Sequence, residues 1–351
     1  MSSYKDNIRQ VVPYVPGEQP KEEGIIKLNT NENPYPPAPG VRALLDSMDT
    51  NRFRLYPDVY AQPIVDALAE HYKLNKDEIF VGVGSDDVIA MAFMTFFNGD
   101  KPILFPQISY SFYSVWADLF KIPYKKVTLN ADFSLNKDAF MQPNSGIIFP
   151  NPNAPTAMAV SVDFIEDVVK NNSDSVVIVD EAYIDFGGVS ALPLIKKYEN
   201  LLVVQTFSKS RSMAGMRIGF AMGNPYLIKA LNDVKFSYNS YTMNMPAQIL
   251  GAEAVKDDAY FKEQVKKIIA TRERIKPQLE ELGFALTDSK ANFFFATHKS
   301  MKAEAIFEAL KAKKIYVRYF KQPLIDNYLR ITIGTDEEMD KLVSELKGII
   351  G

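Results

Sequence analysis

The sequence predicts an α/β protein with a large domain built on a mostly parallel sheet and a smaller α+β domain. Helical and strand-like segments alternate from about residue 60 to about residue 245. The strand-like segments 175–183 and 200–208 are rich in β-branched residues, which is typical of parallel strands buried on both faces. After about residue 245 a long charged helical stretch and short strands follow. The chain has 351 residues, which favours two domains over one.

Each predicted element has its own signal. Apolar residues at helical spacing predict helices at 63–74, 85–97, 109–120 and 162–172. Short apolar runs next to turn residues predict strands at 77–84, 101–106, 122–129, 145–153, 175–183, 200–208 and 216–223. The last third predicts a helical stretch from about Pro246 to Leu282, with amphipathic helices between and after strands at 291–297, 314–320 and 328–334.

The first 40 residues predict an arm that runs over a surface, because they are rich in Pro, Asn and Gly. Docking of this arm is favoured over a disordered tail by its apolar residues Ile8, Val11, Val12 and Tyr14. We therefore expect an arm that joins the small domain, a large domain and a small domain, at residues 1–30, 31–245 and 246–351.

Composition excludes several kinds of protein. The chain has no cysteine, which excludes disulfides, thiolate catalysis and cysteine zinc sites. A formal net charge of -3 gives no basis for binding nucleic acid or an anionic membrane. The start of the chain lacks a signal-peptide pattern and no stretch is long and apolar enough to cross a bilayer, so we expect a cytoplasmic protein. The two histidines, His71 at an exposed helix end and His298 after a strand, indicate neither a zinc site nor a Ser-His-Asp triad.

Two neighbouring segments, VVIVDEAY and LLVVQTFSKSRSMAGMRIGF, hold the groups that a pyridoxal phosphate (PLP) cofactor requires. Lys209 follows a buried strand, at the sheet edge where α/β proteins place ligands, and its amine can condense with an aldehyde. Asp180 ends the preceding strand, and a buried carboxylate there needs a partner such as the pyridine nitrogen. The Tyr183 phenol is placed to donate to the ring oxygen.

A phosphate site is predicted beside these groups. Ser208 and Arg217 flank Lys209 and are suitable ligands for a phosphate dianion. The segment GVGSDDVIAM predicts a helix that starts at Ser85 and Asp86, where free N–H groups attract anions. By itself this segment is a weak signal, because the same residues also cap helices that bind nothing.

The order of these motifs resembles the fold-type I PLP-dependent aminotransferases, and more narrowly the histidinol-phosphate aminotransferase family. The resemblance extends over nearly the whole chain through VVPY, LNTNENP, LYPD, GSDD, SYSFY, NPNAPT, DEAY, SKSRSMAGMRIG and LRITIG. It implies a seven-stranded type of sheet, PLP held by Lys209 as a Schiff base, and proton transfer by the same amine. The activity implied is transamination between L-histidinol phosphate and 2-oxoglutarate in histidine biosynthesis.

The resemblance also implies a role for matching side chains. Asp180 pairs with the ring nitrogen, Tyr183 with the ring oxygen, and Tyr110 stacks on the ring, whereas Phe112 and Tyr113 are expected in the core. The residues implied to hold the phosphate are Ser85, Asp86, Ser208 and Arg217.

Four further residues are implied in substrate binding and assembly. Tyr56 in LYPD matches a tyrosine that reaches the neighbouring subunit's cofactor phosphate, which implies a homodimer; read alone, it is an aromatic anchor at a turn. Arg330 matches the arginine that binds the donor's carboxylate, although an arginine on a strand is as often a surface residue. Arg318 and Tyr14 are implied to join it in recognising the substrate phosphate.

One segment departs from the family pattern. The family's NPTG segment bonds the cofactor's ring oxygen through its asparagine, but here alanine occupies that position as Ala154, and Ala157 replaces the glycine. An alanine cannot make that bond. Either Asn153 reaches the ring oxygen, which we favour, or Tyr183 makes the contact alone.

Three alternative functions remain open. An aromatic amino-acid aminotransferase would share the motifs, and a phosphothreonine-type PLP decarboxylase would use the same residue types to bind phosphate. A non-catalytic binding protein that keeps the fold is disfavoured, because it has no need for both Lys209 and Asp180.

Overall fold

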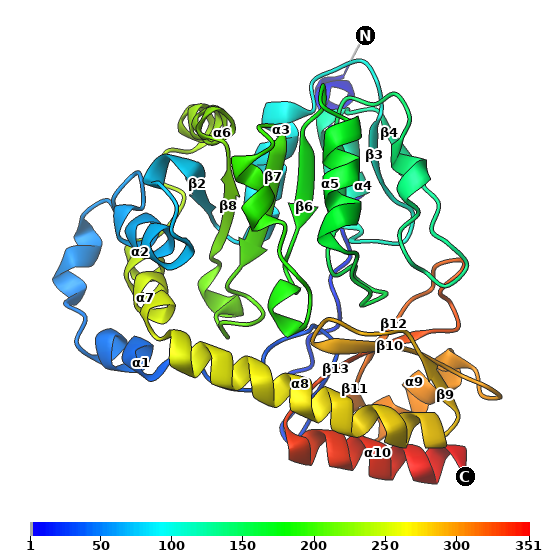
Figure 1. The fold of residues 1–351 in the computed structure, drawn as a ribbon. Helices are drawn as coiled ribbons and strands as arrows, with labels where there is room; N and C mark the ends of the chain where they lie inside the picture. The colour runs from blue at the N-terminus through cyan, green and yellow to red at the C-terminus, as the bar shows by residue number, and fades with distance from the viewer. Residues whose placement is uncertain (1–2) are drawn as a thin grey trace.

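The computed structural model describes residues 3–351 and contains one large and one small layered unit (Figure 1). The large unit is built on seven strands: β2 (Ile79–Gly82), β3 (Ile103–Pro106), β4 (Tyr124–Val127), β5 (Ile147–Pro150), β6 (Val177–Asp180), β7 (Leu201–Thr206) and β8 (Gly219–Gly223). Their order in the sheet is β2-β8-β7-β6-β5-β3-β4. Strand β8 pairs antiparallel with both β2 and β7, and the other neighbouring strands pair in parallel, so the predicted mostly parallel sheet is confirmed.

Helices cover both faces of this sheet (Figure 1). They are α2 (Gln62–Tyr72), α3 (Ser85–Phe96), α4 (Phe112–Phe120), α5 (Val162–Asn171), α6 (Pro225–Tyr238) and α7 (Met245–Lys256), while α1 (Pro39–Asp46) packs against α7. The central strands of this sheet are apolar along both faces, because each face of the sheet packs into its own hydrophobic cluster. In β6, Val177 and Val179 pack toward α2, α5 and α7, and Ile178 packs toward α3, α4 and α6.

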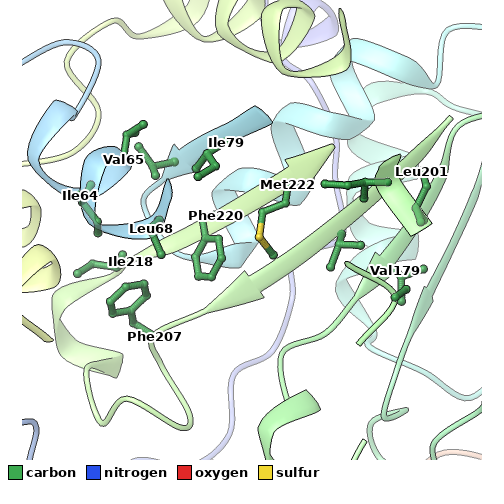
Figure 2. Packing of buried hydrophobic residues seen from close by; sticks show 14 of the residues in the cluster. Ile64, Val65, Leu68, Ile79, Val179, Leu201, Phe207, Ile218, Phe220 and Met222 are labelled. Carbon is green, nitrogen blue, oxygen red and sulfur yellow. The ribbon is translucent and has the colours of Figure 1, made fainter. Parts of the chain in front are cut away.

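Figure 2 shows the first of these two clusters. Phe207, Phe220 and Met222 project from the region of β7 and β8 toward Ile64 and Leu68 of α2. All five side chains are at most 2% exposed. The strand that leads to Lys209 is therefore fixed by packing on both of its faces.

The small unit consists of the C-terminal third of the chain and one strand from the arm. Its elements are β1 (Ile26–Lys27), α8 (Asp258–Glu281), β9 (Phe284–Leu286), β10 (Phe293–His298), α9 (Ala303–Ala312), β11 (Ile315–Tyr316), β12 (Arg318–Tyr319), β13 (Leu329–Thr332) and α10 (Asp336–Ile350). Four strands form an antiparallel sheet of order β12-β13-β10-β9, while β1 pairs in parallel with β11. Short 3-10 helices complete the chain at Tyr4–Asn7, Thr50–Arg54, Lys76–Glu78, Lys137–Phe140, Ile184–Phe186, Leu192–Lys196 and Ala214–Met216.

The predicted helical stretch after residue 245 is two helices, not one. It breaks at Asp257, whose carboxylate accepts a hydrogen bond of 3.0 Å from the Tyr260 N–H and so caps α8. Helix α7 packs against α2 and belongs to the cluster of the large sheet. The expected domain boundaries at residues 30 and 245 stay predictions. The pairing of β1 with β11 supports an arm that joins the small unit.

The two histidines differ in their surroundings. His298 ends β10, as predicted, and its Nε2 lies 2.9 Å from the Leu282 carbonyl oxygen. The prediction of an exposed His71 is wrong, because this side chain is half-buried with its Nε2 3.4 Å from Arg211. Within residues 3–351, none of the helices combines the length and apolarity that a membrane crossing requires.

Candidate active site

A cavity of about 660 Å³ lies at the carboxyl ends of the parallel strands. Pro150, Asp180 and Thr206, which end β5, β6 and β7, form part of its wall. Parallel sheets place ligands at this edge because neighbouring chain segments diverge there. The arm at 13–17 and the segment 318–322 complete the wall. The cavity brings together eleven of the predicted site residues: Tyr14, Ser85, Asp86, Tyr110, Asp180, Tyr183, Ser208, Lys209, Arg217, Arg318 and Arg330.

Lys209 is held from the side of the arm. Its Nζ donates to the Thr30 carbonyl at 3.2 Å and lies 5.6 Å from the centre of the Tyr183 ring. The Asn33 amide donates to the carbonyl oxygens of Lys209 and Ser210 at 3.1 and 3.2 Å. The LNTNENP segment therefore fixes both the backbone and the amine of Lys209.

Asp180 presents a nearly buried carboxylate to the cavity, with 5% of its surface exposed. Burial raises the pKa of Asp180 to about 6, although hydrogen bonds from the Tyr113 hydroxyl (2.7 Å) and the Ala182 N–H (3.2 Å) oppose this shift. A cationic group above the carboxylate would favour its ionised form. The placement of Tyr113 in the core is confirmed, but its bond to Asp180 was missed; its spacing of three residues from Tyr110 was the available signal.

A cradle for an anion lies at the start of α3. A Cβ on Gly84, whose φ is +86°, would lie 2.5 Å from Arg217 Nη2, and one on Gly219 would lie 2.2 Å from the Ser85 nitrogen. Glycine at both positions therefore lets the guanidinium approach the helix start closely. Arg217 Nη1 also donates to Ser208 Oγ at 3.4 Å. The N–H groups of the first helical turn, two hydroxyls and a guanidinium together favour a phosphate.

Asp86 has a different role from the one its sequence position indicates. Its carboxylate is 3.2 Å from Arg217 Nη2 and accepts the Tyr110 hydroxyl at 2.8 Å. An ionised carboxylate only accepts hydrogen bonds, so Asp86 can bind a phosphate through its backbone N–H alone. Burial and the neighbouring Asp86 raise the pKa of Tyr110, which keeps this phenol protonated.

The opposite end of the cavity carries two guanidinium groups. Arg330 on β13 donates to the Asn29 carbonyl at 2.9 Å, and its buried Nε has no hydrogen-bond partner among residues 3–351. Burial lowers the pKa of Arg330, and its guanidinium lies 5.4 Å from the Phe293 ring centre. Arg318 is half-buried nearby. Tyr14 stacks on Phe112, with the two ring centres 4.2 Å apart. This end is built to take an anionic ligand.

Two predicted site residues lie outside the cavity. Asn153 is buried and donates its amide to the Ile108 carbonyl and the Thr156 hydroxyl, both at 3.0 Å, while Ala154 lines the cavity instead. The structure therefore does not bring Asn153 to the position expected for a contact with the ring oxygen. Tyr56 is 80% exposed and packs 4.6 Å from the Tyr241 ring.

Sequence reasoning missed a residue of the arm. Asn31 donates its side-chain amide to the Tyr183 hydroxyl at 2.9 Å. Glu32 also lines the cavity and forms an ion pair with Lys27. The available signal was the run of polar residues between Leu28 and Pro34, two of which, Asn29 and Asn31, are buried.

Fold and site define a class of protein, and comparison with known families agrees. The family described as aminotransferase class I and II matches residues 23–346, so the chain belongs to the class I and II aminotransferases. Within that class it belongs to the family of histidinol-phosphate aminotransferases. A protein of that name from Brachyspira hyodysenteriae is 51% identical over 99% of both chains. A second, from Lactococcus lactis, is 50% identical over 98% of this chain and 97% of its own.

Solved structures show the same fold. The histidinol-phosphate aminotransferase from Sinorhizobium meliloti, in complex with pyridoxal-5'-phosphate, superposes with a TM-score of 0.84 at 22% identity, covering 93% of this chain and 90% of its own. L-threonine-O-3-phosphate decarboxylase from Porphyromonas gingivalis gives a TM-score of 0.81 at 19% identity, covering 93% of this chain and 99% of its own. An aminotransferase and a decarboxylase share this fold, so the fold alone does not select the reaction.

Proposed function

We propose that this chain is a PLP-dependent enzyme that moves an amino group from L-histidinol phosphate to 2-oxoglutarate, giving imidazole-acetol phosphate and L-glutamate. The observation that carries the proposal is the identity of about half of all residues, over nearly the full length, with relatives named for this activity. The cavity supports it with a lysine, a buried carboxylate and guanidinium groups at both ends. The reaction is a step of histidine biosynthesis, for which we propose a cytoplasmic location.

The cavity fits PLP by the chemistry of its side chains. Among residues 3–351 the hydrogen-bond donors to the buried Asp180 carboxylate are neutral, so the ring nitrogen would provide a cationic partner, and the start of α3 forms an anion cradle of the kind that phosphate requires. When bound, the cofactor supplies an electron sink and the carbonyl group that exchanges the amine. The residues proposed to hold its phosphate are Ser85, Asp86 through its N–H, Ser208 and Arg217.

The remaining side chains then act on the cofactor ring and the substrate. Lys209 Nζ holds the cofactor and, once released, moves a proton at the substrate's reacting carbon. Asp180 would keep a negative charge beside the ring nitrogen, the Tyr183 hydroxyl would donate to the ring oxygen, and Tyr110 would stack on the ring. We leave Asn153 out of this set, because its amide donates away from the cavity.

The arginine end of the cavity takes the substrate's anionic groups. Arg330 and Arg318, with Tyr14, bind the phosphate of histidinol phosphate, and Arg330 binds the α-carboxylate of glutamate. One pocket must accept a phosphate in one half of the reaction and a side-chain carboxylate in the other. At least one of the two guanidinium groups therefore serves both ligands.

A homodimer is part of the proposal. The surface around the 3-10 helix Thr50–Arg54 exposes apolar side chains, with Phe53, Leu55, Tyr56 and Tyr60 each at least 50% exposed. An exposed apolar patch of this kind favours a protein partner, and a second copy would bring Tyr56 to the neighbouring cofactor phosphate. Mixing inactive Lys209→Ala and Tyr56→Ala dimers should then restore part of the activity, while no recovery would argue against a shared site.

The substrate assignment is tested by half-reactions on the purified holoenzyme. Incubation with L-glutamate should convert the absorption spectrum of the bound cofactor to that of its amino form. Addition of imidazole-acetol phosphate should then restore the first spectrum, whereas Lys209→Ala should show neither change. Conversion without restoration would reject histidinol phosphate and leave the cofactor assignment intact. Restoration by aromatic keto acids instead, or release of carbon dioxide without a keto acid, would identify the two alternative enzymes.

A further inference from the structure

The hydroxyl of Tyr183 has a neighbour whose chemistry decides where its proton points. Asn31 Nδ2 lies 2.9 Å from the Tyr183 oxygen, and both side chains are buried. An amide nitrogen only donates, so the phenol must accept this bond. Its own proton is then left free to be donated to another acceptor, and the Tyr183 side chain faces the cavity.

The orientation of the Asn31 amide is set by Thr332 on β13. The Thr332 hydroxyl accepts the Asn31 backbone N–H at 3.0 Å and donates to Asn31 Oδ1 at 3.1 Å. With Oδ1 directed to the Thr332 hydroxyl, Nδ2 of the same amide faces the Tyr183 oxygen. The Asn292 amide also donates to the Asn31 carbonyl at 3.1 Å.

The backbone of Asn31 is adapted to this position. Its φ is +57°, a left-handed conformation in which asparagine is favoured over most residues with a side chain. Asn31 is 1% exposed, so its amide has no access to bulk water. The carbonyl oxygen of the neighbouring residue Thr30 accepts a hydrogen bond from Lys209 Nζ. The two consecutive arm residues therefore contact both Lys209 and Tyr183.

We infer that Asn31 is a positioning residue for the reaction: by donating to the Tyr183 oxygen it directs the phenol proton toward the ring oxygen of the cofactor. The inference rests on the proposed function, because it assigns that oxygen as the acceptor. The inference also explains how the site works with alanine at 154. In the family pattern an asparagine and a tyrosine both donate to the ring oxygen; here the Tyr183 phenol, held by the buried Asn31 amide, donates alone.

The consequence is measurable without turnover. A proton is shared between the ring oxygen and the Lys209 nitrogen, and a donor to the ring oxygen weakens the hold on that proton. Loss of a single hydrogen bond should raise the midpoint of the pH titration of the cofactor's visible band by about one pH unit. Asn31→Gly removes the amide and tolerates the positive φ. Asn31→Asp keeps the shape but accepts the phenol proton, so its midpoint should rise further.

A double-mutant cycle separates this role from a merely structural one. In a Tyr183→Phe background, Asn31→Asp and Asn31→Gly should produce no additional shift of the midpoint, because the group through which Asn31 acts is absent. Asn98→Asp is the matched control, since Asn98 is an exposed asparagine beyond the C-terminal end of α3. It should titrate like the wild-type holoenzyme.

Two results would overturn the inference. Asn31→Asp with a visible band that titrates as in wild type would show that Asn31 does not direct the phenol. An equal shift with and without the Tyr183 hydroxyl would show that Asn31 acts by another route. A wild-type protein that forms no visible band with PLP would instead reject the proposed function, so the two failures are distinguishable. Asn31→Asp preserves side-chain volume, and circular dichroism of each holoenzyme verifies that the compared proteins are folded.

Discussion

The Tyr113 hydroxyl donates a 2.7 Å hydrogen bond to Asp180 from the helix layer behind the sheet. Tyr113 is fully buried on α4, and Asp180 ends β6, so the bond joins a helix to the strand end that faces the cavity. The carboxylate that faces the cavity is therefore held by a residue that does not itself line the cavity.

Removal of this phenol should weaken cofactor binding. In Tyr113→Phe the carboxylate loses a donor that lowers its pKa, so the pKa of Asp180 should rise above about 6. The lost hydrogen bond should reduce the free energy of PLP binding by about 1–2 kcal/mol, which corresponds to roughly tenfold weaker binding near neutral pH. Fluorescence titration of the apoenzyme measures it. Tyr198→Phe removes a comparable bond to Glu166 outside the cavity and should leave the affinity unchanged; equal affinity in both variants would contradict the assigned role.

A second prediction concerns stability and pH. Burial raises the pKa of Glu181 to about 7, although Ser190, Ala191 and Gln205 donate to its carboxylate. Folding raises the pKa of Glu181 from 4.5 to about 7, so the folded state favours the protonated carboxyl. The contribution of this group to the free energy of unfolding is therefore fully present below pH 4.5 and is lost as the pH rises through about 7.

Glu181→Gln removes the titrating proton and keeps the side-chain shape. The free energy of unfolding of the apoprotein should fall less between pH 5 and pH 7.5 in this variant than in wild type, by on the order of 2 kcal/mol. Urea unfolding at several pH values measures the difference. The surface variant Glu166→Gln should not flatten the profile, and parallel profiles for wild type and Glu181→Gln would refute the assignment.

A third prediction concerns the missing amide at Ala154. This residue is 7% exposed and lines the cavity, so Ala154→Asn should add a donor to the wall that faces the cofactor. The expected result is a lower midpoint for the pH titration of the visible band, with PLP binding at least as tight as in wild type. Ala154→Leu adds similar volume without an amide and should not lower the midpoint. A matching fall in both variants would point to crowding and not to hydrogen bonding.

A fourth prediction tests the anion cradle. In Gly219→Ala the new Cβ would lie 2.2 Å from the Ser85 nitrogen and 2.3 Å from the Gly84 carbonyl carbon, so the backbone must move away. We expect at least about tenfold weaker binding of PLP and of inorganic phosphate. Gly215→Ala is the control, because Gly215 lies on the same loop and its Cβ would contact none of residues 3–351 within 4 Å beyond its chain neighbours. Unchanged phosphate affinity in Gly219→Ala would place the cradle elsewhere.

The residues that the sequence revealed are those whose neighbours are close along the chain. Lys209, Ser208 and Arg217 lie on one loop after β7, and Asp180 ends the adjacent strand, so the strand pattern and the local motif were sufficient to place them. The sheet was predictable for the same reason, since each β-branched run forms one strand.

The contacts that sequence reasoning missed join distant parts of the chain. Tyr113 and Asp180 are 67 residues apart, and Asn31 and Tyr183 are 152 apart. Such pairings depend on how the helices, the sheet and the arm pack against one another. The periodicity of apolar residues along the sequence does not predict this packing. The helix break at Asp257 was missed because the polar and apolar pattern continues across it, and a single capping carboxylate decides the end.

The pairing of Asn31 with Thr332 spans 301 residues, nearly the entire chain. Protein synthesis proceeds from the N-terminus, so the arm emerges long before the strand that orients its amide has been made. A nascent chain can complete the sheet and the lysine loop while the arm is still unplaced. The capacity to hold PLP in its final geometry should therefore arise at the end of translation, and in a chain truncated before β13 it should be lost even though the large sheet can form.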